Sequence, residues 1–301
     1  MTVRTVEQHI TTDDGVSLWV RDVGDLEGPT VLCFHGGPGL GDYLEPVEEA
    51  LTPAFRVVRW DQRGAGRSDA AGPFTIDRFV ADADAVADAV GLDRYVSLGH
   101  SSGANLAMQH VMTAVGRRAP DVADRIAGVV HIAGTGVEWW PGFSMLHKEY
   151  QVRRLGPEAG ARLAQLLTGD RSPDEDRELR LLYIRSELHD TEDLGTAQRL
   201  YDAEQSLPGN QEANAALNED ARKRSLEQQI IGLSRVRCPV LVLHGASDPR
   251  PIDALASMIA TLPQVQVKII NGAGHSPWLE QPEQLWELVT GFVRLNLPAA
   301  G

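Results

Sequence analysis

The sequence predicts an α/β fold, in which a mostly parallel, eight-stranded sheet is flanked by helices and carries an inserted helical cap. Two observations lead to this prediction. Eight short runs rich in β-branched residues recur along the chain, each with Gly, Pro or Asp at its edges. Between the later runs, apolar residues recur at three- and four-residue spacing, as on one face of a helix. Strands that are apolar throughout and alternate with helices are typical of a parallel sheet covered on both faces.

The expected strands and helices can be placed along the chain from these patterns. Strands are expected at residues 6–12, 16–23, 30–36, 55–61, 95–101, 126–134, 239–245 and 265–272. The clearest helical patterns lie at residues 76–90, 102–116 and 282–297.

The alternation of strands and helices stops between Gly134 and Arg237. The residues there are polar and helical in pattern, with no convincing strand, so we interpret the segment as an insertion. We therefore expect a core domain made of residues 1–134 and 237–301, and a helical cap made of residues 135–236.

The charge of the chain argues against several classes of partner. It carries 42 acidic and 28 basic side chains, for a formal net charge of −14, which disfavours phosphate backbones and anionic membrane surfaces. We expect a small-molecule or short-peptide substrate and neither a nucleic acid nor a membrane as partner. The composition indicates no oligomeric state.

Cellular location can be inferred from the two cysteines and the first residues. Cys33 and Cys238 each lie in an apolar run, which favours buried thiols in a reducing compartment over a disulfide. The first fifteen residues contain no apolar stretch of the kind that signal peptides have, and no segment approaches the roughly 18 apolar residues of a membrane span. These features predict a cytoplasmic protein.

The stretch Gly99-His100-Ser101-Ser102-Gly103 follows one expected strand and precedes an expected helix. In a sharp strand-to-helix turn of the form G-x-S-x-G, the middle serine has a strained backbone and an exposed hydroxyl, and the glycines let neighbouring chains approach. This context selects Ser101 over Ser102 as a nucleophile. The alternative is that Ser101 only caps the following helix.

A serine nucleophile needs a base and a group that orients the base. His275 lies in a polar, glycine-rich loop directly after the last expected strand. Asp248 follows the strand at residues 239–245, at the end of the sheet where ligands gather. The alternative for Asp248 is a turn residue, because Ser-Asp-Pro favours turns. The order Ser101, Asp248, His275 is the one expected of an α/β-hydrolase.

Attack on a carbonyl creates an oxyanion, which needs N–H donors. One donor is expected to be the backbone N–H of Ser102, the residue after the nucleophile. The second should come from His35-Gly36-Gly37-Pro38-Gly39, directly after the expected strand at residues 30–36. Pro38 has no N–H, so Gly37 is the predicted donor.

The HGGPG stretch, together with DQRGAGRSD at residues 61–69, resembles the proline iminopeptidase group of α/β-hydrolase serine peptidases. The resemblance covers about residues 8–134 and residue 237 to the end. It implies that HGGPG lies beside the nucleophile, that the DQRG stretch is chiefly structural and that a helical cap closes the site. No cofactor and no metal are expected.

The resemblance also implies how a substrate's amino terminus is held, namely by glutamates of the cap. The group has a helix of the pattern A-x-x-aromatic-x-x-aromatic-E, and the stretch from Ala197 to Glu204 is similar but lacks both aromatics at their usual places. Glu204 is therefore the candidate ammonium ligand, and Glu219 a weaker second one. The alternative is that both are solvated helix residues.

Aromatic side chains are candidates for an apolar pocket, although aromatics in a cap more often serve packing. They are Trp139, Trp140, Phe143, Tyr150, Tyr183, Tyr201 and Trp278.

The sequence therefore leads to three functional hypotheses. The first is an aminopeptidase or amidase of proline iminopeptidase type, which forms an acyl-enzyme and releases an N-terminal aminoacyl group. The second is a small-molecule carboxylesterase or lactonase with the same triad. The second is favoured by G-H-S-S-G at the turn, where the peptidases carry G-G-S-W-G. The third, a receptor that keeps the fold without chemistry, is disfavoured by the intact set of Ser, His and Asp.

Overall fold

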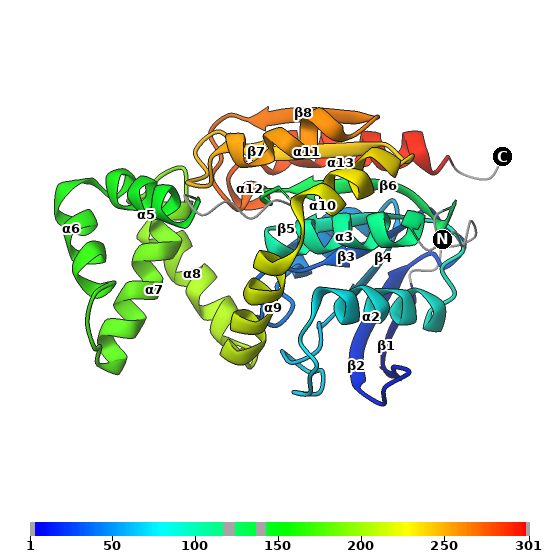
Figure 1. Cartoon of the computed structure of the whole chain (residues 1–301), viewed down its shortest axis with the longest axis horizontal. Helices are drawn as coiled ribbons and strands as arrows, with labels where there is room; N and C mark the ends of the chain where they lie inside the picture. The colour runs from blue at the N-terminus through cyan, green and yellow to red at the C-terminus, as the bar shows by residue number, and fades with distance from the viewer. Residues whose placement is uncertain (1–3, 117–123, 137–142, 299–301) are drawn as a thin grey trace.

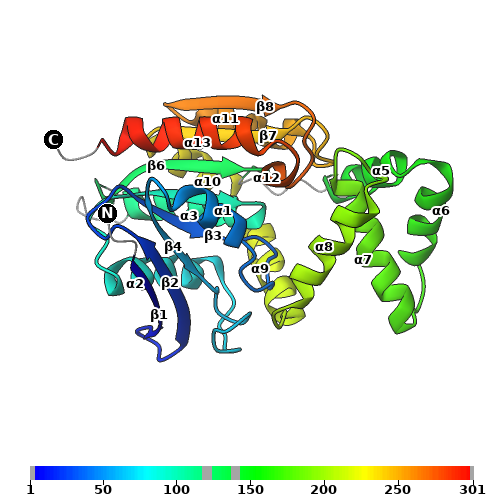
Figure 2. The ribbon, with the colours of Figure 1, turned by 180° about the vertical axis from the view of Figure 1, so that it is seen from behind.

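The computed structural model describes residues 4–116, 124–136 and 143–298. A sheet with helices on both faces forms one part of the molecule, and a group of helices projects beside one end of it (Figures 1 and 2). Within the described ranges, no helix combines the length and the apolar character needed to cross a membrane.

The sheet has eight strands in the order β1-β2-β4-β3-β5-β6-β7-β8. The first two pairs in this order, β1 with β2 and β2 with β4, are antiparallel. All the following pairs, from β4 with β3 to β7 with β8, are parallel. The prediction of a mostly parallel, eight-stranded sheet is therefore confirmed. The strands are β1 Arg4–Thr11, β2 Ser17–Gly24, β3 Thr30–Phe34, β4 Arg56–Trp60, β5 Tyr95–His100, β6 Ile126–Ile132, β7 Val240–Gly245 and β8 Val265–Ile270.

Helices cover the two faces of the sheet and enclose a separate apolar core on each side (Figures 1 and 2). In β3, Leu32 and Phe34 pack on the face covered by α2 and α3, while Val31 and Cys33 pack on the face covered by α1 and α13. Successive side chains of a strand point to opposite faces, so an apolar strand fills both cores. The helices of this part are α1 Glu45–Leu51, α2 Ile76–Ala89, α3 Ser102–Gly116, η1 Ile252–Leu255, α11 Ala256–Thr261, α12 Pro277–Glu280 and α13 Pro282–Asn296.

The segment between β6 and β7 is helical in the described residues, but its helices pack in two different places. Those from α5 to α8 project beyond the sheet and have small apolar clusters of their own. By contrast, Ala213 and Leu217 of α9 and Leu233 of α10 belong to the core on the α2 and α3 face. The helices are α5 Phe143–Arg154, α6 Gly156–Leu166, α7 Pro173–Glu187, α8 Leu194–Gln205, α9 Gln211–Lys223 and α10 Leu226–Arg235.

The packing therefore divides the segment more finely than the predicted boundaries of 135–236. We use the word cap below for helices α5 to α8. In two of these helices, α7 and α8, a side chain accepts a hydrogen bond from a backbone N–H of the first turn. Ser172 and Glu175 form a capping box at the start of α7, and the Asp193 carboxylate accepts a hydrogen bond from the Thr196 N–H at the start of α8.

The stretch at residues 61–69 forms hydrogen bonds and ion pairs with neighbouring segments, which fits the structural role that the resemblance implies for it. Both side-chain oxygens of Asp61 accept backbone N–H bonds, from Asp42 at 2.6 Å and from Arg67 at 2.8 Å. The Arg63 guanidinium is fully buried and forms two bonds to Asp82, at 2.6 and 2.7 Å, and two to Asp14, both at 3.0 Å. A buried charge of this kind needs its partners, because water cannot reach it.

The Asp82→Ala variant is expected to lower the free energy of unfolding by about 3 kcal/mol or more, because it leaves Arg63 buried with one carboxylate fewer. Urea denaturation followed by circular dichroism measures this. The matched control is Asp13→Ala, which removes a carboxylate that is 78% exposed and should leave the midpoint unchanged. Equal midpoints for the two variants would show that the Arg63 cluster does not stabilise the fold.

Candidate active site

Ser101 occupies the turn between β5 and α3 with a left-handed backbone, at φ = 56°. Its N–H donates to the carbonyl oxygen of Ile132 at 2.9 Å, which fixes the turn to β6. A Cβ at Gly103 would lie 2.1 Å from the Phe34 carbonyl oxygen, and one at Gly99 would lie 2.3 Å from the Gly103 carbonyl oxygen. Only glycine fits at these two positions, so the sequence around Ser101 is the one that this turn requires.

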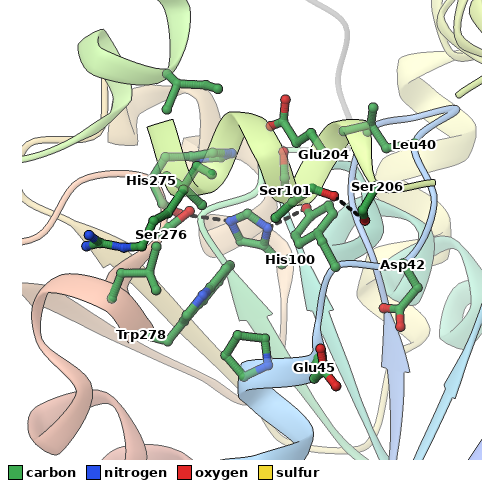
Figure 3. Close-up of a pocket in the computed structure, with 18 of the residues that line it drawn as sticks. Leu40, Asp42, Glu45, His100, Ser101, Glu204, Ser206, His275, Ser276 and Trp278 are labelled. Atoms are coloured by element: carbon green, nitrogen blue, oxygen red, sulfur yellow. Dashed lines mark hydrogen bonds between the residues drawn. The ribbon is translucent and has the colours of Figure 1, made fainter. Parts of the chain in front are cut away.

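The side chain of Ser101 does not cap α3. Among the described residues, no backbone N–H in the first turn of α3 donates to the Ser101 hydroxyl. The hydroxyl lines a pocket instead, together with the ring of His275 (Figure 3). The capping alternative therefore finds no support in the hydrogen bonds of this turn.

Asp248 and His275 are brought together by the loops after β7 and β8. The distance from His275 Nδ1 to Asp248 Oδ2 is 2.7 Å, and the Asp248 side chain is completely buried. Burial by itself raises the pKa of Asp248, but the neighbouring charges of His275 and Arg250 outweigh it and hold the pKa below its usual range. The ionised carboxylate accepts the proton on Nδ1 of His275, so in the neutral ring Nε2 is left as an acceptor.

The Ser101 hydroxyl and the His275 ring line one pocket without a direct hydrogen bond between them in the described part of the chain. Catalytic contacts are often long in a free enzyme and shorten when substrate binds. The arrangement supplies a nucleophile, a base and a buried carboxylate that orients the base.

Two backbone N–H groups beside Ser101 are free of protein acceptors. Over the residues that the structure describes, neither the Gly37 N–H nor the Ser102 N–H donates a hydrogen bond. Gly37 lines the pocket and has a φ of 137°, which disfavours any side chain there. Both groups are thus available to an oxyanion, and their role as its donors stays a prediction.

Tyr43 and His100 connect the HGGPG loop to the loop of His275. The Tyr43 hydroxyl oxygen accepts from the Gly36 N–H at 2.9 Å and lies 2.6 Å from His100 Nδ1. His100 Nε2 lies 2.8 Å from the carbonyl oxygen of His275, as the dashed line in Figure 3 shows. A carbonyl only accepts, so Nε2 of His100 donates and its Nδ1 accepts the Tyr43 proton.

His100 stays neutral in this chain of hydrogen bonds. Burial, and then the charge of the nearby His275, lower the pKa of His100 well below its usual value. The sequence placed His100 beside Ser101 in the G-H-S-S-G stretch, but it did not indicate Tyr43. No spacing rule links Tyr43 to the turn at Ser101, and only the folded chain brings them together.

The pocket has a volume of about 590 Å³ and is lined by Ser101 and His275 on one side and by the cap on the other. One face of α7 and one face of α8 form its cap side, since the lining residues recur at three- and four-residue spacing. These residues are Arg180, Ile184 and Glu187 from α7, Leu188 directly after it, and Thr196, Arg199, Leu200, Ala203 and Glu204 from α8.

Glu204 lines the pocket, as the resemblance implies, but its carboxylate is already engaged. Both of its oxygens accept bonds from the Arg180 guanidinium, one of them from Nε at 2.6 Å. Glu219 does not line the pocket, and its exposed carboxylate lies beside Arg222 and Lys223 on α9. The pairing of Glu204 was not predictable from the pattern of its own helix.

Of the aromatic candidates whose side chains the structure describes, Trp278 lines the pocket, whereas Tyr150, Tyr183 and Tyr201 do not. Tyr201 does not line the pocket, because its ring packs in the small cluster with Ile184 and Leu188, with the Arg177 guanidinium 5.6 Å from its centroid. Trp278 does line the pocket and contacts the His100 ring edge-on, at 4.5 Å between centroids. Trp139 and Trp140 lie outside the described residues.

Comparison with known proteins supports the fold and relates the chain to several hydrolases. A family model described as alpha/beta hydrolase fold matches residues 29–282. A proline iminopeptidase of Xanthomonas citri is 26% identical over 303 residues, covering 93% of both chains. An esterase of Exiguobacterium antarcticum is similar in structure, with a TM-score of 0.74 at 17% identity, over 96% of this chain and all of that one. The predicted α/β-hydrolase fold and the resemblance to the proline iminopeptidase group are confirmed.

Other similarities cover shorter segments. A protein named probable oxidoreductase EphD, of Mycobacterium tuberculosis, is 32% identical over 129 residues, or 42% of this chain. The match spans 21% of the length of that relative. A match over so small a part of that relative supports no inference about the activity of this chain.

The Tyr43→Phe variant is expected to lower kcat by about tenfold or more, because it removes the proton that His100 Nδ1 accepts and so loosens the His275 loop. The measurement is the rate on an activated ester, such as p-nitrophenyl acetate. Tyr201→Phe is the matched control and should keep its rate within about twofold, since Tyr201 lies outside the pocket. Unchanged kcat in Tyr43→Phe would contradict the role given to this hydrogen-bond chain.

Proposed function

The chain belongs to the α/β hydrolase fold family, and we propose that it is a serine hydrolase that forms an acyl-enzyme on Ser101. The observation that carries the proposal is the left-handed Ser101 in a pocket with His275, whose Nδ1 is 2.7 Å from the buried Asp248 carboxylate. The pKa of Asp248, which the charges of His275 and Arg250 hold below its usual range, supports its proposed role as the anion that orients His275.

Acylation begins when His275 Nε2 takes the proton of the Ser101 hydroxyl as its oxygen attacks the substrate carbonyl. The N–H groups of Gly37 and Ser102 then stabilise the oxyanion, at roughly a hundred- to a thousandfold in rate for each donor. The imidazolium, held by Asp248, gives its proton to the leaving group as the bond to that group breaks.

Deacylation repeats these steps with water as the nucleophile. His275 removes a proton from the water molecule, its oxygen attacks the acyl carbonyl, and the same N–H groups stabilise the second oxyanion. His275 returns its proton to Ser101 as the acid leaves. Water and substrate are therefore the sole reactants in this cycle.

A small-molecule carboxylic ester is the substrate class that we propose first. The carboxylates of the pocket that come from the cap are both paired, Glu204 with Arg180 and Glu187 with Arg250. A substrate ammonium would have to displace a guanidinium from Glu204, which loses a bidentate charge-assisted pair. An uncharged acyl chain meets no such cost, and leucine and isoleucine side chains line the same pocket: Leu40, Ile184, Leu188, Leu200, Leu207 and Leu279.

An aminopeptidase or amidase of proline iminopeptidase type is the second candidate. The similarity to the Xanthomonas citri enzyme over nearly the whole chain favours it, and Glu204 does line the pocket. In this alternative the substrate's amino terminus exchanges with Arg180 at Glu204. The two candidates share one acyl-enzyme mechanism and differ in what occupies the cap side of the pocket.

A fluorophosphonate is expected to label Ser101 covalently, because the activated serine oxygen attacks its phosphorus as it would attack a carbonyl carbon. Mass spectrometry of the digested protein identifies the labelled residue. Ser101→Ala should lose both labelling and turnover, whereas Ser102→Ala should keep both within a few-fold, since Ser102 acts through its backbone. Label on another residue, or turnover that persists in Ser101→Ala, would contradict the proposal.

The two substrate classes are separated by comparing short acyl esters with prolyl and alanyl arylamides. We expect a higher kcat/KM for the esters and an effect of Glu204→Gln that is similar on both substrate types. Glu219→Gln, the same change on an exposed helix face, serves as the control. If arylamides are turned over faster, and Glu204→Gln raises their KM more than tenfold without affecting esters, the peptidase is correct.

A further inference from the structure

Arg250 bridges the catalytic acid and the cap. Its backbone N–H donates to Asp248 Oδ1 at 2.9 Å, and its Nη1 lies 3.3 Å from the same oxygen. Its Nη2 donates to Oε1 of Glu187 at 2.7 Å. Glu187 is the last residue of α7, so one guanidinium joins the triad carboxylate to the end of a cap helix.

The backbone of Glu187 also contacts the catalytic base. Its carbonyl oxygen accepts the N–H of His275 at 2.7 Å. A Cβ at Gly274 would lie 2.0 Å from that oxygen, so the two chains approach as closely as glycine permits. The carbonyl oxygen of His275 accepts a hydrogen bond from His100. The backbone of His275 is therefore bonded to the cap through its N–H and to the sheet domain through its carbonyl.

The charges around this bridge alternate in sign. Burial alone raises the pKa of Glu187, but the charges of Arg250 and His275 outweigh it and lower the pKa to about 2. Glu187 is therefore an anion at neutral pH. It balances Arg250, so that the charge of Asp248 remains to stabilise the imidazolium that forms during the reaction.

We propose that Glu187 and Arg250 are positioning residues for the Asp248 and His275 pair, and that α7 of the cap thereby forms part of the catalytic apparatus. Glu187 orients Arg250 through its carboxylate and His275 through its carbonyl, while Arg250 orients Asp248. The inference rests on the proposed serine hydrolase, since it assigns these residues to the base of that reaction. Because Glu187 and Arg250 lie close to His275, removing either charge should change the protonation of His275, which removing a salt bridge elsewhere in the cap would not do.

The test uses the pH dependence of fluorophosphonate labelling at Ser101, which needs the unprotonated base but no knowledge of the substrate. Several charged and titratable groups surround His275, and each variant changes no more than one of them. They are Asp248, Glu187, Arg250, His100, His147 and His244.

The Glu187→Gln and Arg250→Gln variants should shift the acidic limb of this profile in opposite directions. Removing the anion destabilises the imidazolium, so labelling should persist to lower pH by about half a unit or more. Removing the cation stabilises the imidazolium, so the limb should move to higher pH by a similar amount. Arg250→Lys keeps the charge and should leave the limb near its original position.

Glu178→Gln is the matched control, because it removes a carboxylate from the same helix that pairs with Arg162 outside the pocket. Opposite shifts in the two test variants, with none in Glu178→Gln, support the inference. An unshifted limb in Glu187→Gln, or a limb in Arg250→Gln that matches that of Arg250→Lys, overturns it. Absence of labelling at Ser101 in the unaltered protein overturns the proposed function itself.

Discussion

The left-handed backbone at Ser101 is the constraint on which the rest of the site depends. It turns the chain from β5 into α3 within one residue, which leaves the serine hydroxyl in the pocket and the next N–H free. The turn is possible because Gly103 lets α3 approach the end of β3. That contact also places the HGGPG loop, and with it Gly37, beside the nucleophile. A side chain at Gly103 would therefore disturb the nucleophile and both N–H groups at once.

The two parts of the molecule contribute differently to the chemistry. The sheet supplies the triad at the ends of β5, β7 and β8, where parallel strands deliver loops to a common edge. The cap supplies the opposite wall, in which Glu204 and Glu187 are each paired with an arginine. These pairs neutralise both carboxylates of the wall, and Ile184, Leu188 and Leu200 supply apolar surface beside them. The two parts meet at His275, whose N–H donates to the carbonyl oxygen of Glu187 at the end of α7.

Much of the site follows from local sequence, and the remainder depends on long-range contacts. Ser101, Asp248 and His275 were predictable because each follows a recognisable strand and has a distinct neighbourhood of glycine or turn residues. Arg180 precedes Glu204 by 24 residues on another helix, so no local pattern indicates their pairing.

The same limit explains the cap. Helices α9 and α10 are polar in sequence like their neighbours, yet a few apolar residues on each pack into the sheet domain's core. Tyr201 is an aromatic residue of the kind that often lines pockets, but its position on α8 directs its ring into a small apolar cluster within the cap. The sequence states which residues are apolar, and tertiary packing decides which surface they face.

The central claim is that Ser101 carries the acyl group during turnover. Acid quenching during steady-state hydrolysis of an acetate ester, followed by mass spectrometry of the digest, tests it most directly. The account predicts one acetyl group on the peptide that contains Ser101, and none on the corresponding peptide of Ser101→Ala. An acetyl group on a different residue, while the ester is being turned over, would contradict it.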